Sequence, residues 1–142
     1  MSTPSAPLLR VSGLKVGYGR IEAVRGVDLA VAQGEFVAVV GSNGAGKSST
    51  MRAIAGSVKP AGGQIVLDGE DVTTLPSHLK VRRGIAMVPE GRMIFGNQSV
   101  RDNLLLGAYP RIRTDKAGVA NDLDEVLTLF PLLRERLDQL GA

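Results

Sequence analysis

The chain has 142 residues, 44% of them apolar and 22% charged, a balance that excludes disorder along its whole length and allows one compact domain. No apolar run approaches the ~20 residues that span a bilayer, and we expect no secretory signal. The absence of cysteine excludes disulfides and cysteine-based catalytic or zinc sites. The net charge of +3 comes from scattered residues and only 4% of positions are aromatic, so we expect no nucleic-acid partner.

The first third of the sequence predicts strands that lead into a helix. A β-prone stretch covers residues 8–18, partial alternation follows over 24–31, and residues 36–40 are all apolar. A continuous apolar run of this length is typical of a strand buried on both faces of a parallel sheet. The glycine-rich segment 41–46 then precedes a helix predicted over 47–55.

The middle of the chain predicts a hairpin, a short helix and a further strand. Residues 64–67 and 71–73 flank an Asp-Gly turn signal. Ser77 is expected to cap the short helix that follows. Residues 85–88 form a second apolar run, which predicts another short buried strand.

The last third of the chain predicts helices. Ser99 and Asp102 have the spacing of a capping box, with Asp in place of Glu, so a helix is predicted to start there. Apolar residues then recur at helical spacing over 119–130, and the pattern continues over 133–140.

The residues that point to chemistry lie in the glycine-rich segment. Gly-Ser-Asn-Gly-Ala-Gly-Lys47-Ser48 matches the pattern G-x-x-x-x-G-K-[ST] between the predicted strand and helix. Glycines let successive backbone N–H groups surround an anion, and the helix start adds partial positive charge. Lys47 contributes a full positive charge, the Ser48 hydroxyl can coordinate Mg²⁺ on the phosphates, and Ser49 is placed to reach the α-phosphate. The predicted phosphate site comprises Gly41, Ser42, Asn43, Gly44, Ala45, Gly46, Lys47, Ser48 and Ser49.

This loop resembles the Walker A loop of ATP-binding-cassette (ABC) ATPases, and the resemblance extends from Leu9 to Leu140. It implies ATP and Mg²⁺ as cofactors, with Lys47 as a catalytic residue and Ser48 as a metal ligand. Tyr18 is similar to the aromatic residue of the family's A-loop, which implies that it stacks on adenine. Glu90 stands where the family's Q-loop usually has glutamine, which implies a catalytic role and a contact with Mg²⁺. A glutamate keeps the oxygen acceptor and adds a negative charge.

The segment around Glu90 and the helix start that follows look most like the ATP-binding subunits that drive branched-chain amino-acid uptake. That implies an ATPase at the cytoplasmic face of the inner (plasma) membrane, with transmembrane permease subunits and a second ATP-binding subunit, in a homo- or heterodimer, as partners. It also implies contact between residues 95–106 and a cytoplasmic coupling helix. The apolar stretch 92–95 supports this contact if it is exposed, and it could equally tuck into the core.

Several other functions remain open on the sequence. Related ABC systems for urea, amides or lipids share much of the pattern. A soluble ABC ATPase of DNA repair or translation would carry a strongly basic face and bind nucleic acid in a salt-sensitive way. A P-loop kinase and a binding-only remnant are further alternatives, although the hairpin-rich first third argues against the kinase.

The expected fold is α/β, a P-loop NTPase of ABC ATPase type. It comprises an N-terminal antiparallel β part, an incomplete parallel-sheet core and the start of a helical subdomain. Residues 1–142 are expected to form a partial domain, with the nucleotide-binding core over 1–90 and the Q-loop end and helical subdomain over 91–142.

The sequence contains no motif resembling the family's signature, Walker B or switch histidine. His78 lies in a predicted surface helix, where we expect no catalytic role. We therefore expect the chain to be the N-terminal portion of a longer subunit, and to bind ATP without hydrolysing it alone. Unpaired edges of the predicted strand 36–40 are expected to promote aggregation, domain swapping or partial disorder.

Overall fold

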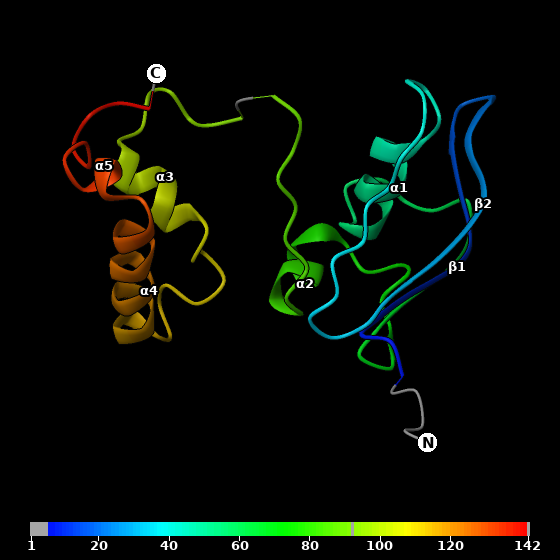
Figure 1. Cartoon of the computed structure of the whole chain (residues 1–142), viewed down its shortest axis with the longest axis horizontal. Helices are drawn as coiled ribbons and strands as arrows, with labels where there is room; N and C mark the ends of the chain where they lie inside the picture. The colour runs from blue at the N-terminus through cyan, green and yellow to red at the C-terminus, as the bar shows by residue number, and fades with distance from the viewer. Residues whose placement is uncertain (1–5, 92, 142) are drawn as a thin grey trace. The chain divides into compact units, whose positions relative to one another are not determined.

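The computed structural model describes residues 6–91 and 93–141, and the chain divides into two compact units, Met1–Met87 and Val88–Ala142 (Figure 1). Among the described residues, the first unit contains strands β1–β4 with helices α1 and α2, and the second contains α3, α4 and α5. None of the helices in these described ranges is both long and apolar enough to cross a bilayer.

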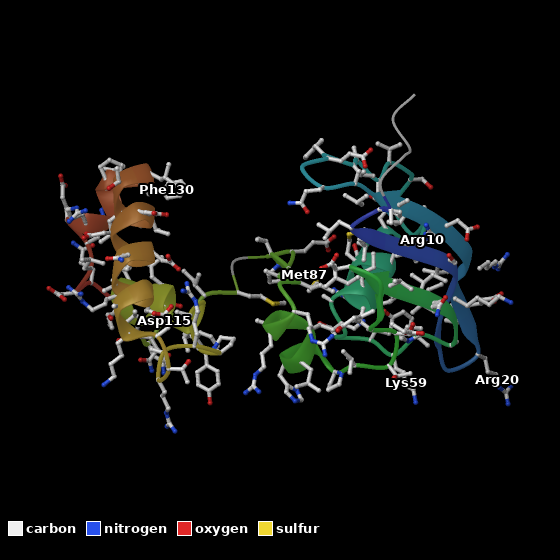
Figure 2. The ribbon with its side chains drawn as sticks, turned by 90° about the horizontal axis from the view of Figure 1, so that it is seen from below. Arg10, Arg20, Lys59, Met87, Asp115 and Phe130 are labelled. Carbon is white, nitrogen blue, oxygen red and sulfur yellow. The ribbon has the colours of Figure 1, made fainter. Side chains whose placement is uncertain are left out.

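An antiparallel sheet with strand order β2-β1-β3-β4 forms most of the first unit. Its strands are β1 (Leu9–Tyr18), β2 (Ile21–Val31), β3 (Gly62–Leu67) and β4 (Glu70–Asp71). β1 and β2 pair from Leu9 with Val31 to Tyr18 with Ile21, and Figure 2 shows Arg20 at the tip of this hairpin. The strands predicted over 8–18 and 24–31 and the predicted hairpin are therefore confirmed, with Glu70–Asp71 as the second strand of that hairpin in place of 71–73.

A bulge in β1 sets which of its side chains face the core. Gly13 has φ +57°, and its N–H donates to the Asp28 carboxylate at 2.7 Å. The register of β1 against β2 shifts between Val11 and Leu14, so both side chains are buried although they are three residues apart. The core then consists of Val11, Leu14, Val16, Val24, Ile65 and Val72 together with Ala53 and Ile54 of α1 (Lys47–Ile54).

Helix α2 (Ser77–Arg82) forms where a short helix was predicted, but Ser77 does not cap it. The N-cap residue is Pro76, whose carbonyl accepts from the N–H groups of Leu79 and Lys80. Pro76 takes the extended conformation that an N-cap requires, so Ser77 becomes the first helical residue. His78 is exposed on this helix, as predicted.

The two predicted buried strands are not formed. Residues 36–40 and 85–88 have no strand assignment, and Phe36, Val40 and Val88 are 92%, 88% and 96% exposed. Within the described part of the chain, no backbone hydrogen bond joins residues 36–40 to another segment. A parallel strand needs neighbours on both edges and a layer on each face, and the antiparallel sheet provides neither for these runs. The apolar side chains of residues 36–40 are therefore exposed, but without the strand whose unpaired edges were expected.

The second unit is helical, with α3 (Val100–Leu106), α4 (Lys116–Leu129) and α5 (Pro131–Arg134). The predicted capping box is confirmed, because Ser99 Oγ accepts from the Asp102 N–H while the Ser99 N–H donates to the Asp102 carboxylate. Figure 2 shows Asp115 and Phe130 at the two ends of α4.

The prediction of a helix over 133–140 is wrong beyond Arg134. The carbonyls of Leu137 and Gln139 accept from the N–H groups of Arg101 and Val100, at 2.9 and 2.8 Å. Leu140 also forms an isolated antiparallel bridge with Ser99. These long-range bonds replace the bonds that a helix would make, and such bonds are invisible to a local apolar period.

Candidate functional site

The glycine-rich segment lies between β2 and α1 and ends in a turn that starts the helix. The Ala45 N–H donates to the Ser42 carbonyl at 3.1 Å, and Gly46 is the N-cap residue with φ +91°. Thr50 is buried, and both its N–H and its hydroxyl donate to the Gly46 carbonyl, at 2.8 and 2.9 Å. The first turn of α1 is therefore tied directly to the last residue of the loop.

Gly46 is required at its position for two independent reasons. Its positive φ is strained for any residue with a Cβ. A Cβ built there would also lie 2.5 Å from the carbonyl oxygen of Ala23 and 3.1 Å from the side chain of Val24, both on β2. At Gly46 the loop thus lies so close to β2 that only a residue without a side chain fits.

A lysine ammonium group and the N-terminus of a helix meet at the start of α1. Lys47 Nζ donates to the carbonyls of Gly41 and Ser42, at 2.7 and 2.8 Å, so the side chain bends back over the loop. The N-terminus of α1 has no side-chain cap and no acidic residue in its first turn. The helix end, the ammonium group and the loop amides together offer a concentrated positive site to an anion.

Tyr18 lies beside this loop although it is 31 positions distant from Ser49 in the sequence. The Tyr18 hydroxyl donates to Ser49 Oγ at 3.4 Å, and the tyrosine is 43% exposed. The structure therefore brings together the end of β1 and the first turn of α1, which places an aromatic ring beside the predicted phosphate-binding segment.

The donor set of this site suits Mg²⁺ bound together with phosphates rather than an all-protein metal cage. Ser48 is half-buried in the first turn of α1, next to Lys47. Among the described residues, no group of three or more His, Asp or Glu side chains is placed to hold a metal ion. Mg²⁺ commonly keeps waters and takes only one or two protein ligands beside nucleotide phosphates, so a single hydroxyl fits this role.

Glu90 belongs to the second unit and is exposed. Since the loop 41–46 belongs to the first unit, the meeting of Glu90 with the phosphate-binding segment stays a prediction. In the same stretch, Met93, Ile94 and Phe95 are 71%, 56% and 58% exposed, and Arg92 lies outside the described residues.

An apolar groove of about 480 Å³ lies in the second unit. Phe95 lines it together with Leu105, Leu106, Tyr109 and Ile112 from α3 and the segment after it. The Asn103 side chain accepts from the Phe95 N–H at 2.8 Å and donates to the carbonyls of Phe95 and Ser99 at 3.0 and 2.9 Å. Sequence reasoning missed Asn103, although its place directly after the capping box was a signal that could have drawn attention to it.

Comparison with known proteins gives consistent results. A family model described as ABC transporter matches residues 24–140. The chain is 43% identical over 122 residues to the high-affinity branched-chain amino acid transport ATP-binding protein BraG of Pseudomonas aeruginosa, covering 86% of this chain and 51% of that protein. It is 36% identical over 127 residues to the probable branched-chain amino acid transport ATP-binding protein LivF of Archaeoglobus fulgidus, covering 89% and 52%.

Other relatives carry different names. The chain is 39% identical over 107 residues to the lipopolysaccharide export system ATP-binding protein LptB of Escherichia coli, covering 75% of this chain and 44% of that protein. A solved structure of an ATP-binding subunit of an ABC transporter matches with a TM-score of 0.77 and 31% identity, covering 94% of this chain and 54% of that chain. The chain thus spans about half the length of the curated relatives it matches.

Proposed function

The chain belongs to the ABC transporter family, and on that premise we propose that its segment Gly41–Ser49 binds the phosphates of ATP. The observation that carries the proposal is the start of α1, where Lys47 bends over the carbonyls of Gly41 and Ser42 at a helix end free of acidic residues. Asn43, Gly44 and Gly46 supply backbone N–H groups to the phosphates, and Lys47 supplies the charge. The Ala45 N–H instead holds the turn through the Ser42 carbonyl.

The remaining predicted residues complete this proposed site. Tyr18 stacks on the adenine, which its position beside Ser49 supports. Ser48 and Glu90 are the proposed ligands of Mg²⁺, which neutralises phosphate charge when bound. Lys47 and Glu90 are the residues that we assign to catalysis in the intact subunit.

For the whole protein, we propose an ATP-binding subunit that energises the import of branched-chain amino acids through ATP binding and hydrolysis in a dimer. The likeness to BraG and LivF supports this substrate class, and the likeness to LptB keeps a lipid system as the alternative. The partners are transmembrane permease subunits and a second ATP-binding subunit, and the protein is peripheral on the cytoplasmic face of the membrane. We assign residues 1–90 to the nucleotide-binding core and 91–142 to the Q-loop end and helical subdomain.

The apolar groove of the second unit is the proposed contact for the permease. It presents Phe95 from the segment before α3, Leu106 at the end of α3 and Tyr109 just after it, and these side chains are 58%, 44% and 75% exposed. A short amphipathic helix can bury its apolar face in a groove of this kind. Two hydrogen bonds of the Asn103 side chain, to the N–H and the carbonyl of Phe95, hold the Phe95 backbone in place for such a contact.

Calorimetric titration of the chain with Mg-ATP tests the nucleotide site. We expect saturable binding that weakens by about 10- to 100-fold in Lys47→Ala, because charge-assisted bonds to phosphate are lost. Ser48→Ala should weaken binding in the presence of Mg²⁺ and change it little in EDTA. Binding that is equally strong in the wild type and in Lys47→Ala would contradict the proposal.

A further inference from the structure

A lysine is fully buried behind the helix that carries the proposed site. Lys80 of α2 has no exposed surface, and its Nζ donates to the carbonyls of Ala53 and Ile54 at 3.1 and 3.0 Å. Both carbonyls lie at the C-terminal end of α1, where a helix has partial negative charge, and the Ala53 carbonyl also accepts from the Gly56 N–H at 3.1 Å. The ammonium group therefore caps α1 from a different element of the fold.

Burying the charged ammonium group of Lys80 costs folding free energy that an uncharged side chain would not cost. Desolvation lowers the pKa of Lys80, and the carboxylate of Asp71 opposes that shift. An apolar residue of similar volume, such as methionine, would fill the same space without desolvating a charge. What distinguishes lysine here is its ability to donate to two carbonyls at once.

Helix α1 is held closely at both of its ends. At the N-terminal end, Gly46 leaves no room for a Cβ against the Ala23 carbonyl. At the C-terminal end, a Cβ on Gly56 would lie 2.9 Å from the Ser77 nitrogen and 3.0 Å from Lys80 Cδ. With 8 residues α1 is only about 12 Å long, so a displacement at one end moves the other.

We propose that Lys80 is a positioning residue for nucleotide binding: its bonds to Ala53 and Ile54 fix the orientation of α1 and hence the phosphate-binding loop at the other end. The inference rests on the proposed ATP site and adds a residue that does not touch the nucleotide. Without these bonds, α1 samples orientations in which the loop is not competent. The apparent affinity for the nucleotide is then the intrinsic affinity multiplied by the fraction of time in which the loop can bind.

The test compares Mg-ATP affinity in three variants of the full chain by calorimetry. Lys80→Met keeps the side-chain volume and removes the hydrogen-bond donor. Lys80→Gln keeps an amide donor, and its affinity can be measured even if the methionine variant fails to fold. Leu127→Ala is the control for lost stability, because Leu127 is buried on α4 and lies outside the core that contains Ala53 and Ile54. Amide exchange of residues 47–50 is followed in parallel.

We expect Lys80→Met to weaken Mg-ATP binding about tenfold, which corresponds to a loop that can bind for about a tenth of the time. Lys80→Gln should lose less affinity. Amide exchange at residues 47–50 should accelerate, and Leu127→Ala should keep the wild-type affinity despite a lower melting temperature. The inference is overturned if both Lys80 variants bind like the wild type, or if Leu127→Ala loses as much affinity as Lys80→Met. A wild-type chain without Lys47-dependent binding would instead overturn the proposed function, and this inference with it.

Discussion

Gly46 and Gly44 lie two positions apart in the loop and have similar backbone angles but different surroundings. Gly44 has φ +85° and Gly46 has φ +91°, so either alanine variant is strained. A Cβ at Gly44 would have no heavy atom within 4 Å, whereas one at Gly46 would collide with the Ala23 carbonyl. Comparing Gly44→Ala with Gly46→Ala therefore separates the effect of backbone strain from the effect of close packing against β2.

We expect Gly44→Ala to lose about 1 kcal/mol of unfolding free energy, the cost of a left-handed residue with a Cβ. Gly46→Ala should lose about 2 kcal/mol or more, because the collision with a backbone carbonyl adds to the same strain. Urea denaturation of the two variants measures the difference. Equal losses would show that the approach of the loop to β2 contributes nothing.

At the scale of elements, the pairs and turns determined by nearby residues were predictable. The capping box of Ser99 and Asp102 needs only a spacing of three residues, and α1 and the hairpins form where local patterns placed them. The runs 36–40 and 85–88 were not predictable in the same way, because an apolar run predicts burial only if neighbouring strands exist to bury it.

Lys80 shows a different limit of sequence reasoning. A lysine on a short helix is ordinarily a surface residue, and no local pattern distinguishes it from its neighbours. Its burial depends on the C-terminal end of α1, which lies 26 and 27 positions earlier in the sequence. Asn103 and the bonds that end the last helix at Arg134 depend on tertiary contacts in the same way.

The exposed run 36–40 leads to a prediction about self-association. Residues 36–40 are five consecutive apolar residues without backbone hydrogen bonds to other segments of the described chain, and Phe36 is 92% exposed. Such a run can associate with the same run of another copy. We expect Phe36→Lys to reduce self-association and to change the unfolding free energy by no more than about 0.5 kcal/mol, as for surface substitutions. Light scattering after size-exclusion chromatography measures the mass. An unchanged distribution of oligomers would count against this role of the run.

The β3–β4 hairpin contains a carboxylate, that of Asp71, with an unusually low pKa. Hydrogen bonds from the Gln64 amide, then from the Thr73 hydroxyl and N–H, lower the pKa of Asp71 from 3.8 to about 2. Because the folded pKa is lower than the unfolded one, the stabilisation is complete above about pH 4 and is lost as the pH falls through about 2.

We expect Asp71→Asn to be less stable than the wild type at pH 6 and to approach it as the pH falls from 4 to 2. The asparagine cannot ionise, so its stability lacks this component of the pH dependence. Thermal melts of the two proteins across this range measure the effect. Parallel curves at all pH values would mean that the bonds to Asp71 do not stabilise the folded state.

At the scale of the whole molecule, the predicted ABC ATPase type of fold is confirmed by the family match over 24–140 and by the likeness to a solved ATP-binding subunit. The chain covers 54% of that subunit and 51% of BraG. The 142 residues contain no motif resembling the family's signature, Walker B or switch histidine. Phosphoryl-transfer catalysis depends on residues that position the attacking water and stabilise charge.

We therefore expect the 142-residue chain to bind Mg-ATP without turning it over. Phosphate release from the purified chain should equal that of Lys47→Ala within error, since positioning and charge stabilisation supply nearly all of phosphoryl-transfer catalysis. A coupled phosphate assay measures the rate. Turnover that depends on Lys47 would contradict the account of what these residues can do.

The central claim is that the segment Gly41–Ser49 holds the phosphates of ATP, and the most direct measurement is an NMR titration of the ¹⁵N-labelled chain with Mg-ATP. We predict that the amide signals of residues 43–49 shift together and saturate, that Tyr18 shifts with ATP but not with inorganic triphosphate, and that Lys47→Ala suppresses these changes. If the amides of residues 43–49 stay in place while Mg-ATP is added, or shift equally in Lys47→Ala, the proposed site is wrong.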